Sequence, residues 1–364
     1  MGLDNIIRMN LYTLIPVSLT PLPSSFFHFS VCGLLLPKKS QRAYYAIRAF
    51  NVELASIKDG SSLRRRSAPD QAPGGDSTST NMTTSLALQM RMQWWRDAVQ
   101  AIYEDEDETV LKSMKASPTT PDHLINLSIS CWNSPVVRAL DRAHAEMNLT
   151  RRFLERLIDA REMDLDVRQH ASLEEAVSYA EDSVSSLLYL SLECTGVRDD
   201  QADIVASHAG VGIGLTNTCL RAMRFRLSQG EISLPAELFP TNFSYQGLIQ
   251  SIQNSAASND EDDSSDKTNL DPKDLAIVNE AINHVANEAL AHLQTARDIQ
   301  GQVPKHGRSA LLPVVPAIHY LNLWNECSPK DDRLKGLLMA QTQQEQKRLS
   351  LLLFLGRAWL TGVI

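Results

Sequence analysis

Two separate stretches of the chain carry charged side chains at positions that could serve a phosphorylated ligand. The first stretch, residues 44–59, has only two carboxylates, Glu53 and Asp59. Carboxylates that share one face of a helix can hold a divalent cation, and the cation then neutralises a diphosphate. With only Glu53 and Asp59, residues 44–59 have few of the carboxylates that such a cation site would need.

The second stretch, residues 206–235, carries the opposite charge. It contains no Asp or Glu before Glu231, and three arginines lie near its end: Arg221, Arg224 and Arg226. These cations would repel Mg²⁺, but they could bind a phosphate directly through charge-assisted hydrogen bonds. An equally good interpretation is that they face solvent or pair with acids elsewhere in the chain.

Two further groups have side chains of the types that bind metals. One lies at the end of a predicted helix and the other along one helix face: Glu162, Asp164 and Asp166, and His284, Glu288 and His292. Surface ion pairs and a polar helix face are the commoner explanations of such groups. We therefore predict no metal site at either.

The elements that position these residues are predicted to be helices. Apolar residues at Ile47, Phe50, Leu54 and Ile57 recur at steps of three and four, which is typical of one buried helix face. The second stretch is rich in small residues, from Ala209 to Gly214, and these let another helix or a ligand come close.

The same periodicity recurs along the rest of the chain. Further helices are predicted over residues 86–103, 135–147, 150–161, 172–194, 275–299 and 311–324. We expect Thr150 to cap one of them and Ser172 to open a capping box with Glu175. Polar segments near 60–84 and 255–271 are predicted to be mobile insertions. No strand-like alternation appears, so the sequence predicts an all-α fold.

Three features resemble the squalene/phytoene synthase family: AIRAFNVELA at residues 46–55, MRMQWW at 90–95, and SH-x-G at 207–210 followed by CLRA at 219–222. The resemblance covers roughly residues 32–324. It implies an isoprenoid-synthase-like helical bundle around a central cavity. Active members join two prenyl diphosphates head to head, with Mg²⁺ held between two Asp-rich helices.

This sequence departs from both Asp-rich motifs. Where the first motif ends in Asp-Asp-x-x-Asp, the chain has Ala55, Ser56 and Asp59, and Glu53 just before them could be a substitute ligand. The aspartates of the second motif fall on Ala222 and Arg226. The resemblance therefore implies a vestigial diphosphate pocket that has lost its metal site.

Within the family, the three features resemble a divergent mitochondrial branch. That resemblance implies a non-catalytic role in the early assembly of respiratory complex I, without a cofactor, on the matrix side of the inner membrane. The implied partners are complex I subunits or other assembly factors, and a lipid or prenyl ligand for the old cavity stays open. Two alternatives remain. One is a working prenyl diphosphate transferase whose carboxylates come from unexpected positions, such as Glu53, Asp59, Asp164 and Asp166, and the other is an isoprenoid or lipid carrier.

Of the 364 residues, 43% are hydrophobic and 21% are charged. This composition is typical of a globular protein with a sizeable core. The net charge of −8 argues against a general nucleic-acid binder. Five scattered cysteines without CxxC spacing indicate reduced thiols rather than disulfides or a zinc site.

The two ends of the chain differ from its middle. We assign residues 1–31 to an N-terminal extension, 32–325 to the helical domain and 326–364 to an apolar helical tail. Prolines interrupt the uncharged residues 9–37, so we predict no spanning helix there, and Arg8 alone is weak support for an import signal. The tail could dock on the core, cover a partner or lie on a membrane.

Overall fold

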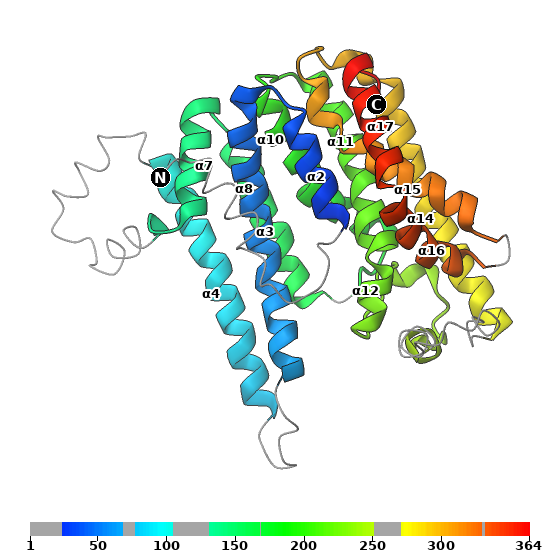
Figure 1. Cartoon of the computed structure of the whole chain (residues 1–364). Coiled ribbons are helices and arrows are strands. Elements are labelled where there is room, and N and C mark those ends of the chain that lie inside the picture. The colour runs from blue at the N-terminus through cyan, green and yellow to red at the C-terminus, as the bar shows by residue number, and fades with distance from the viewer. Residues whose placement is uncertain (1–23, 68–76, 105–130, 168, 251–270, 330–331) are drawn as a thin grey trace.

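The fold is described from a computed structural model, which covers residues 24–67, 77–104, 131–167, 169–250, 271–329 and 332–364. Every regular element in these ranges is helical, which confirms the predicted all-α fold (Figure 1). The α-helices are α2 (Ser24–Leu34), α3 (Lys38–Ser67), α4 (Ser77–Glu104), α7 (Pro135–Met147), α8 (Arg151–Asp166), α9 (Leu173–Ala180), α10 (Ser186–Cys194), α11 (Asp200–Leu215), α12 (Met223–Ser228), α14 (Pro272–Asp298), α15 (Val314–Cys327), α16 (Arg333–Gln346) and α17 (Arg348–Thr361).

Two π-helical turns, η1 (Glu181–Ser185) and η2 (Thr216–Arg221), join α9 to α10 and α11 to α12. The helix predicted over 172–194 is therefore interrupted once. A π turn holds one residue more than an α turn, so it rotates the faces of the residues that follow. Residues 245–250 are also helical, and three short 3₁₀ turns occur: η3 (Ala236–Leu238), η4 (Gln300–Gln302) and η5 (Arg308–Leu311).

The loop predicted over 60–84 is shorter than expected. α3 continues to Ser67 and α4 begins at Ser77. The physical reason lies in residues 63–66, one leucine and three arginines, all of which favour helix over coil. The insertion predicted over 255–271 falls outside the described residues except for Asp271, which caps α14 by accepting from the Lys273 amide at 3.0 Å.

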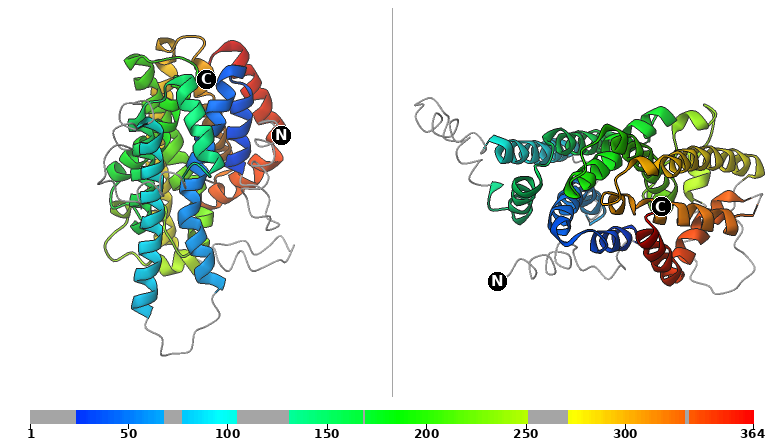
Figure 2. Two further views of the ribbon diagram at one scale, coloured as in Figure 1. Left: turned by 90° about the vertical axis from the view of Figure 1, so that its left-hand side faces the viewer. Right: turned by 90° about the horizontal axis from the view of Figure 1, so that it is seen from above.

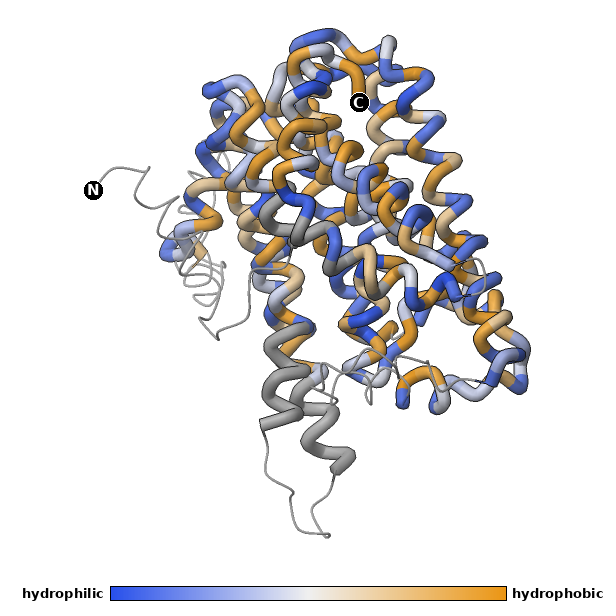
Figure 3. The backbone as a smooth tube through the Cα atoms, turned by 45° about the vertical axis from the view of Figure 1, so that its right-hand side comes forward, coloured by the Kyte–Doolittle hydropathy of each residue, from blue (hydrophilic) through white to orange (hydrophobic). Residues whose placement is uncertain are grey.

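Two apolar clusters form the core, and α10 lies between them. α3, α4, α7 and α8 build the first cluster, and α11, α14, α15 and α16 build most of the second. Leu187 and Leu190 of α10 face the first cluster, whereas Leu188 and Leu192 face the second. Most of the other helices mix hydrophobic and hydrophilic residues along their length, as expected for amphipathic helices with one face in the core (Figure 3).

Glycines let α11 pack closely on both sides. A Cβ added at Gly210 would lie 2.4 Å from the Ser185 Cα, and one added at Gly212 would lie 2.9 Å from the Ala289 carbonyl oxygen. The close approach predicted for this stretch is therefore made by η1 on one side and α14 on the other. In both places a neighbouring helix occupies the space that the missing side chains leave.

The C-terminal tail docks on the core through one side of α17. Leu351, Leu355 and Ala358 are buried against Cys32 of α2 and Leu312. The indole Nε1 of Trp359 also donates to the Leu35 carbonyl at 2.8 Å, so α2 and α17 lie side by side (Figure 2). Within the described ranges, no helix has both the length and the apolar character needed to cross a bilayer.

Candidate functional site

The two stretches singled out in the sequence meet at one carboxylate, that of Asp164 in the last turn of α8. Lys58 of α3 places its Nζ 3.0 Å from Asp164 Oδ1. Arg226 of α12 places its Nη2 3.6 Å from the same oxygen. The ammonium group of Lys58 also donates to the backbone carbonyls of Asp164, at 2.6 Å, and of Val167, at 3.4 Å.

The Lys58 ammonium group is thus surrounded by oxygen atoms, as a bound metal cation would be. Arg226 is held in turn by Glu231, whose Oε2 lies 2.7 Å from Nη1. Burial alone would lower the pKa of Arg226, but Asp164 and Glu231 raise it. A Mg²⁺ ion approaching Asp164 would therefore have to displace or adjoin the basic groups of Lys58 and Arg226.

A second layer of polar side chains packs beside this cluster. Arg161 donates to the Tyr179 hydroxyl at 2.9 Å and to Asn51 Oδ1 at 3.3 Å. Burial raises the pKa of Tyr179 and lowers that of His170, whose ring lies against Tyr179 with 5.2 Å between ring centres. Both groups are consequently uncharged near neutral pH, which leaves the arginines and lysine as the cations of the site.

The predicted residues of α3 lie along the helix that carries Lys58. Glu53 is half-buried, and burial raises its pKa while Arg91 opposes the shift. Ala55 is half-buried and has no ligand atom, whereas Ser56 is exposed and donates to the Glu53 carbonyl at 2.8 Å. The backbone of Asp59 belongs to α3, but its side chain lies outside the description.

The three arginines of the second stretch lie in three different surroundings. Arg226 belongs to the Asp164 cluster, and Arg224 is exposed. Arg221 lies over the Tyr320 ring, 5.3 Å from its centre, and donates to Asn217 Oδ1 at 3.2 Å. Burial lowers the pKa of Arg221. Ala222, at the junction of η2 and α12, adds no ligand atom.

The other candidate metal ligands divide between different partners. Glu162 pairs with Arg96 of α4, and the side chain of Asp166 lies outside the description. His292 lies 3.5 Å from Glu288, but His284 is exposed. In the part of the chain that the structure describes, no three His, Cys, Asp or Glu residues are grouped so as to hold a metal ion.

Three polar contacts were not predicted from the sequence. His208 Nδ1 lies 3.0 Å from His292 Nδ1, between α11 and α14. Glu181 accepts from the Tyr189 hydroxyl at 2.6 Å and from Ser207 Oγ at 2.9 Å. Burial would raise the pKa of Glu181, but these hydrogen bonds and a third from Ser185 hold it below its ordinary range. The packing of α11 against η1 and against α14 brings these residues together, so no local pattern could have shown them.

Known proteins resemble this chain over most of its length. The "NADH dehydrogenase (ubiquinone) complex I, assembly factor 6" of Rattus norvegicus is 33% identical over 292 residues, which are 80% of this chain and 68% of that protein. The protein of the same name from Homo sapiens is 31% identical over the same shares. The homologue from Drosophila melanogaster is 28% identical, over 80% of this chain and 69% of its own.

Solved structures share the fold at lower identity. Squalene synthase HpnC from Alicyclobacillus acidocaldarius matches with a TM-score of 0.53 and 16% identity, over 90% of this chain and 96% of that one. A dehydrosqualene synthase in complex with ligand matches with the same TM-score and 13% identity, over 94% and 96%. The squalene/phytoene synthase family model matches residues 24–326. The fold, the two motif helices and this match agree: the chain belongs to the squalene/phytoene synthase family.

Proposed function

We propose that this protein is a non-catalytic assembly factor for mitochondrial respiratory complex I and acts early in its assembly. The proposal is supported by relatives that carry the name of a complex I assembly factor and match 80% of this chain. A fold can persist after its site is lost, so the absence of catalysis has to be argued from the site itself.

The observation that carries the proposal is the pairing of Lys58 and Arg226 with Asp164. Enzymes of this fold need carboxylates to hold Mg²⁺ against a departing diphosphate. Here two cations, fixed by hydrogen bonds, occupy the surroundings of the carboxylate. The two motifs themselves supply Ala55, Ser56 and Ala222 in place of ligands. The site is that of a pseudoenzyme.

The compartment and partners follow from the same proposal. Complex I lies in the inner mitochondrial membrane, so an assembly factor for it would work there, on the matrix side. Its partners would be complex I subunits or other assembly factors, and recognition would use the surface of the helical bundle rather than a reaction site.

The direct test is deletion of the gene in the organism that carries it, followed by native gel electrophoresis of its respiratory complexes. We expect complex I to be lost or arrested as a subassembly, while complexes III and IV stay at normal levels. Re-expression of the wild-type chain should restore complex I. An unchanged complex I, or an equal loss of all complexes, would refute the assembly role.

A variant separates the assembly role from a surviving enzymatic one. Asp59 is the last acid of the first motif, and Asp59→Asn removes its charge with little change of shape. We expect this variant to restore complex I as fully as the wild type. Purified wild-type protein given farnesyl diphosphate and Mg²⁺ should form no head-to-head product. A product whose rate of formation drops in Asp59→Asn would contradict the pseudoenzyme proposal.

A further inference from the structure

The outward side of α17 is a continuous apolar face. Leu349, Leu353 and Leu360 are 78%, 76% and 77% exposed. Leu352 and Trp359 extend this face to one side, and Val363 lies exposed just beyond the end of the helix. We call the face formed by these six residues the α17 surface.

The spacing of these residues explains why the core does not cover them. An α-helix advances about 100° per residue, so Leu349, Leu353 and Leu360 fall within about 40° of one another. The buried residues of α17, Leu351, Leu355 and Ala358, lie on the opposite side. A helix that is apolar all round is ordinarily covered all round, and α17 is covered on one side only within the described structure.

The charged side chains of residues 347–364 are all cationic, and Glu326 of α15 lies 3.9 Å from Lys347. Residues 347–364 include Lys347, Arg348 and Arg357 but no Asp or Glu, in a chain whose net charge is −8. Arg348 and Arg357 lie on opposite flanks of the apolar face, as their spacing on the helix requires. This distribution would attract an anionic surface and repel a cationic one.

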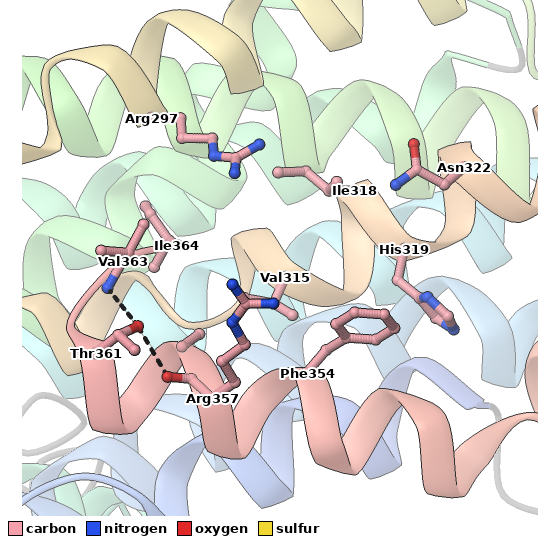
Figure 4. A pocket seen from close by; sticks show the side chains of 11 residues that line it. Arg297, Val315, Ile318, His319, Asn322, Phe354, Arg357, Thr361, Val363 and Ile364 are labelled. Carbon is pink, nitrogen blue, oxygen red and sulfur yellow. Dashed lines mark hydrogen bonds between the residues drawn. The ribbon is translucent and has the colours of Figure 1, made fainter.

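A pocket of about 360 Å³ lies along one flank of α17, between this helix and α15 (Figure 4). The guanidinium groups of Arg297 and Arg357 both project into it, and Ile318 and Phe354 form apolar walls. His319 also lines the pocket, and its Nε2 is buried without a hydrogen-bond partner among the described residues. No Asp or Glu lines this pocket.

A second pocket, of about 280 Å³, lies on the other flank, between α17 and the end of α2. Lys305, His306 and Arg308 line it, together with Trp359. Arg308 also donates to the carbonyls of Val303 and Gly362, at 3.1 and 3.3 Å, which fixes its position. No Asp or Glu lines this pocket either. The apolar face is thus bordered on both sides by hollows that expose cationic side chains.

We infer that the α17 surface docks on a membrane that contains anionic phospholipid, with the apolar face in the headgroup–acyl boundary and lipid phosphates in the two flanking pockets. An apolar helix face with cations beside it and an aromatic residue at its edge is the pattern of an interfacial helix. A protein partner would equally cover the leucines, but it would have no reason to find pockets lined by cations and by no acid on both sides of them.

The inference adds a membrane-binding surface to the proposed function. It rests on that function only for which membrane the surface binds. Vesicle binding can be measured without complex I, so the two proposals can fail separately. A wild-type chain that binds neither kind of vesicle but restores complex I would reject this inference and leave the assembly role intact.

The experiment is flotation of the purified full chain with vesicles of phosphatidylcholine, alone or mixed with phosphatidylglycerol. We expect the protein to float with the mixed vesicles, more weakly with the neutral ones, and less as salt is raised. In Leu353→Glu/Leu360→Glu, binding to mixed vesicles should fall roughly tenfold or more, because anions replace two leucines that docking would bury in the membrane. The matched control is Met90→Glu, whose side chain is 65% exposed on α4 and lies outside this surface.

A second pair of variants tests the pocket between α17 and α15. Arg297→Gln/Arg357→Gln should weaken binding to the mixed vesicles more than binding to the neutral ones, and Arg138→Gln, an exposed arginine of α7, should change neither. Circular dichroism and thermal unfolding would establish that each variant is folded.

Three results would overturn the inference. The first is a wild-type chain that floats with neither vesicle. The second is a leucine double variant that binds as the wild type does. The third is a wild-type dimer, seen by light scattering, that the leucine substitutions dissociate, because that would assign the surface to a second copy of the chain.

Discussion

The ammonium group of Lys58 lies 3.0 Å from the carboxylate of Asp164, although 106 residues separate them in the sequence. Both side chains are mostly buried, with 19% and 13% of their surface exposed. The pair ties α3 to α8, and Arg226 joins α12 to the same carboxylate. The cluster that closes the candidate site is therefore also a structural joint of the fold.

Asp164→Asn should reduce the free energy of unfolding by about 2–4 kcal/mol, because it leaves two cations with less compensation in a mostly buried place. Urea unfolding would measure the change. The control is Glu155→Gln, which breaks an exposed pair with Arg151 within α8 and should cost only about 0.5 kcal/mol. Equal, small effects of the two substitutions would show that the cluster does not stabilise the fold.

Glu193 of α10 caps the start of α8 from outside that helix. Its carboxylate accepts from the Thr150 amide at 2.9 Å and from the Thr150 hydroxyl, and Arg198 pairs with it at 2.7 Å. The expected cap, Thr150, makes no side-chain capping bond itself. Glu193 is 5% exposed, so its charged hydrogen bonds are protected from water.

Glu193→Ala should therefore destabilise the protein by about 2–3 kcal/mol in urea unfolding, since it strands a buried amide and one arginine. An ordinary cap offers the comparison. Ser172 accepts from the Glu175 amide at 3.1 Å, and Ser172→Ala should cost about 1 kcal/mol. If Glu193→Ala cost no more than Ser172→Ala, the cross-helix cap would be unimportant.

Gly210→Ala should destabilise the fold by about 1–3 kcal/mol, because the new methyl group would overlap the Ser185 backbone and push η1 away from α11. Gly356 gives a control within another helix. A Cβ added there meets nothing within 4 Å, so Gly356→Ala should stabilise the protein by about 0.5–1 kcal/mol. Thermal unfolding of both variants would check the two signs, and a neutral Gly210→Ala would contradict the close packing.

Local signals in the sequence predicted the elements well. α7 spans the predicted residues 135–147, with Ser134 as its cap and Pro135 at its first position. The capping role of Ser172 is confirmed, although the Glu175 carboxylate accepts from the Ala171 amide rather than from that of Ser172. Such signals act within one helical turn, which is why they can be read from one segment.

The candidate site could be predicted only in part. The loss of motif carboxylates at Ala55, Ser56 and Ala222 is visible in the sequence, because it concerns residue types alone. Arg226 was expected either to bind an anion or to pair with an acid elsewhere, but its partner Asp164 and the second cation, Lys58, were not predicted, since they come from helices distant in the chain. The π turn η2 made the contacts of α12 harder to predict. Its extra residue rotates the helix that follows, so a regular α-helical repeat gives the wrong face of α12 as the one that packs on the fold.

The buried histidines should make stability depend on pH. Burial, and after it the neighbouring His208, lowers the pKa of His292 below its ordinary value of 6.5, while Glu288 and Glu181 oppose the shift. The unfolded chain therefore binds a proton at a higher pH than the folded chain does. Stability from this group is fully present above pH 6.5 and declines as the pH falls towards the folded-state pKa. His170 and His319 act in the same direction, because burial lowers their pKa values too.

His292→Gln should flatten this decline, because it removes the group whose protonation the fold resists. Urea unfolding at a series of pH values from about 7 to 5 would measure the slope of the free energy of unfolding in each variant. His284→Gln is the matched control, since His284 is exposed on the same helix and should leave the wild-type slope unchanged. A His292→Gln variant with the wild-type slope would mean that the pair of imidazoles, 3.0 Å apart at their Nδ1 atoms, does not couple folding to protonation.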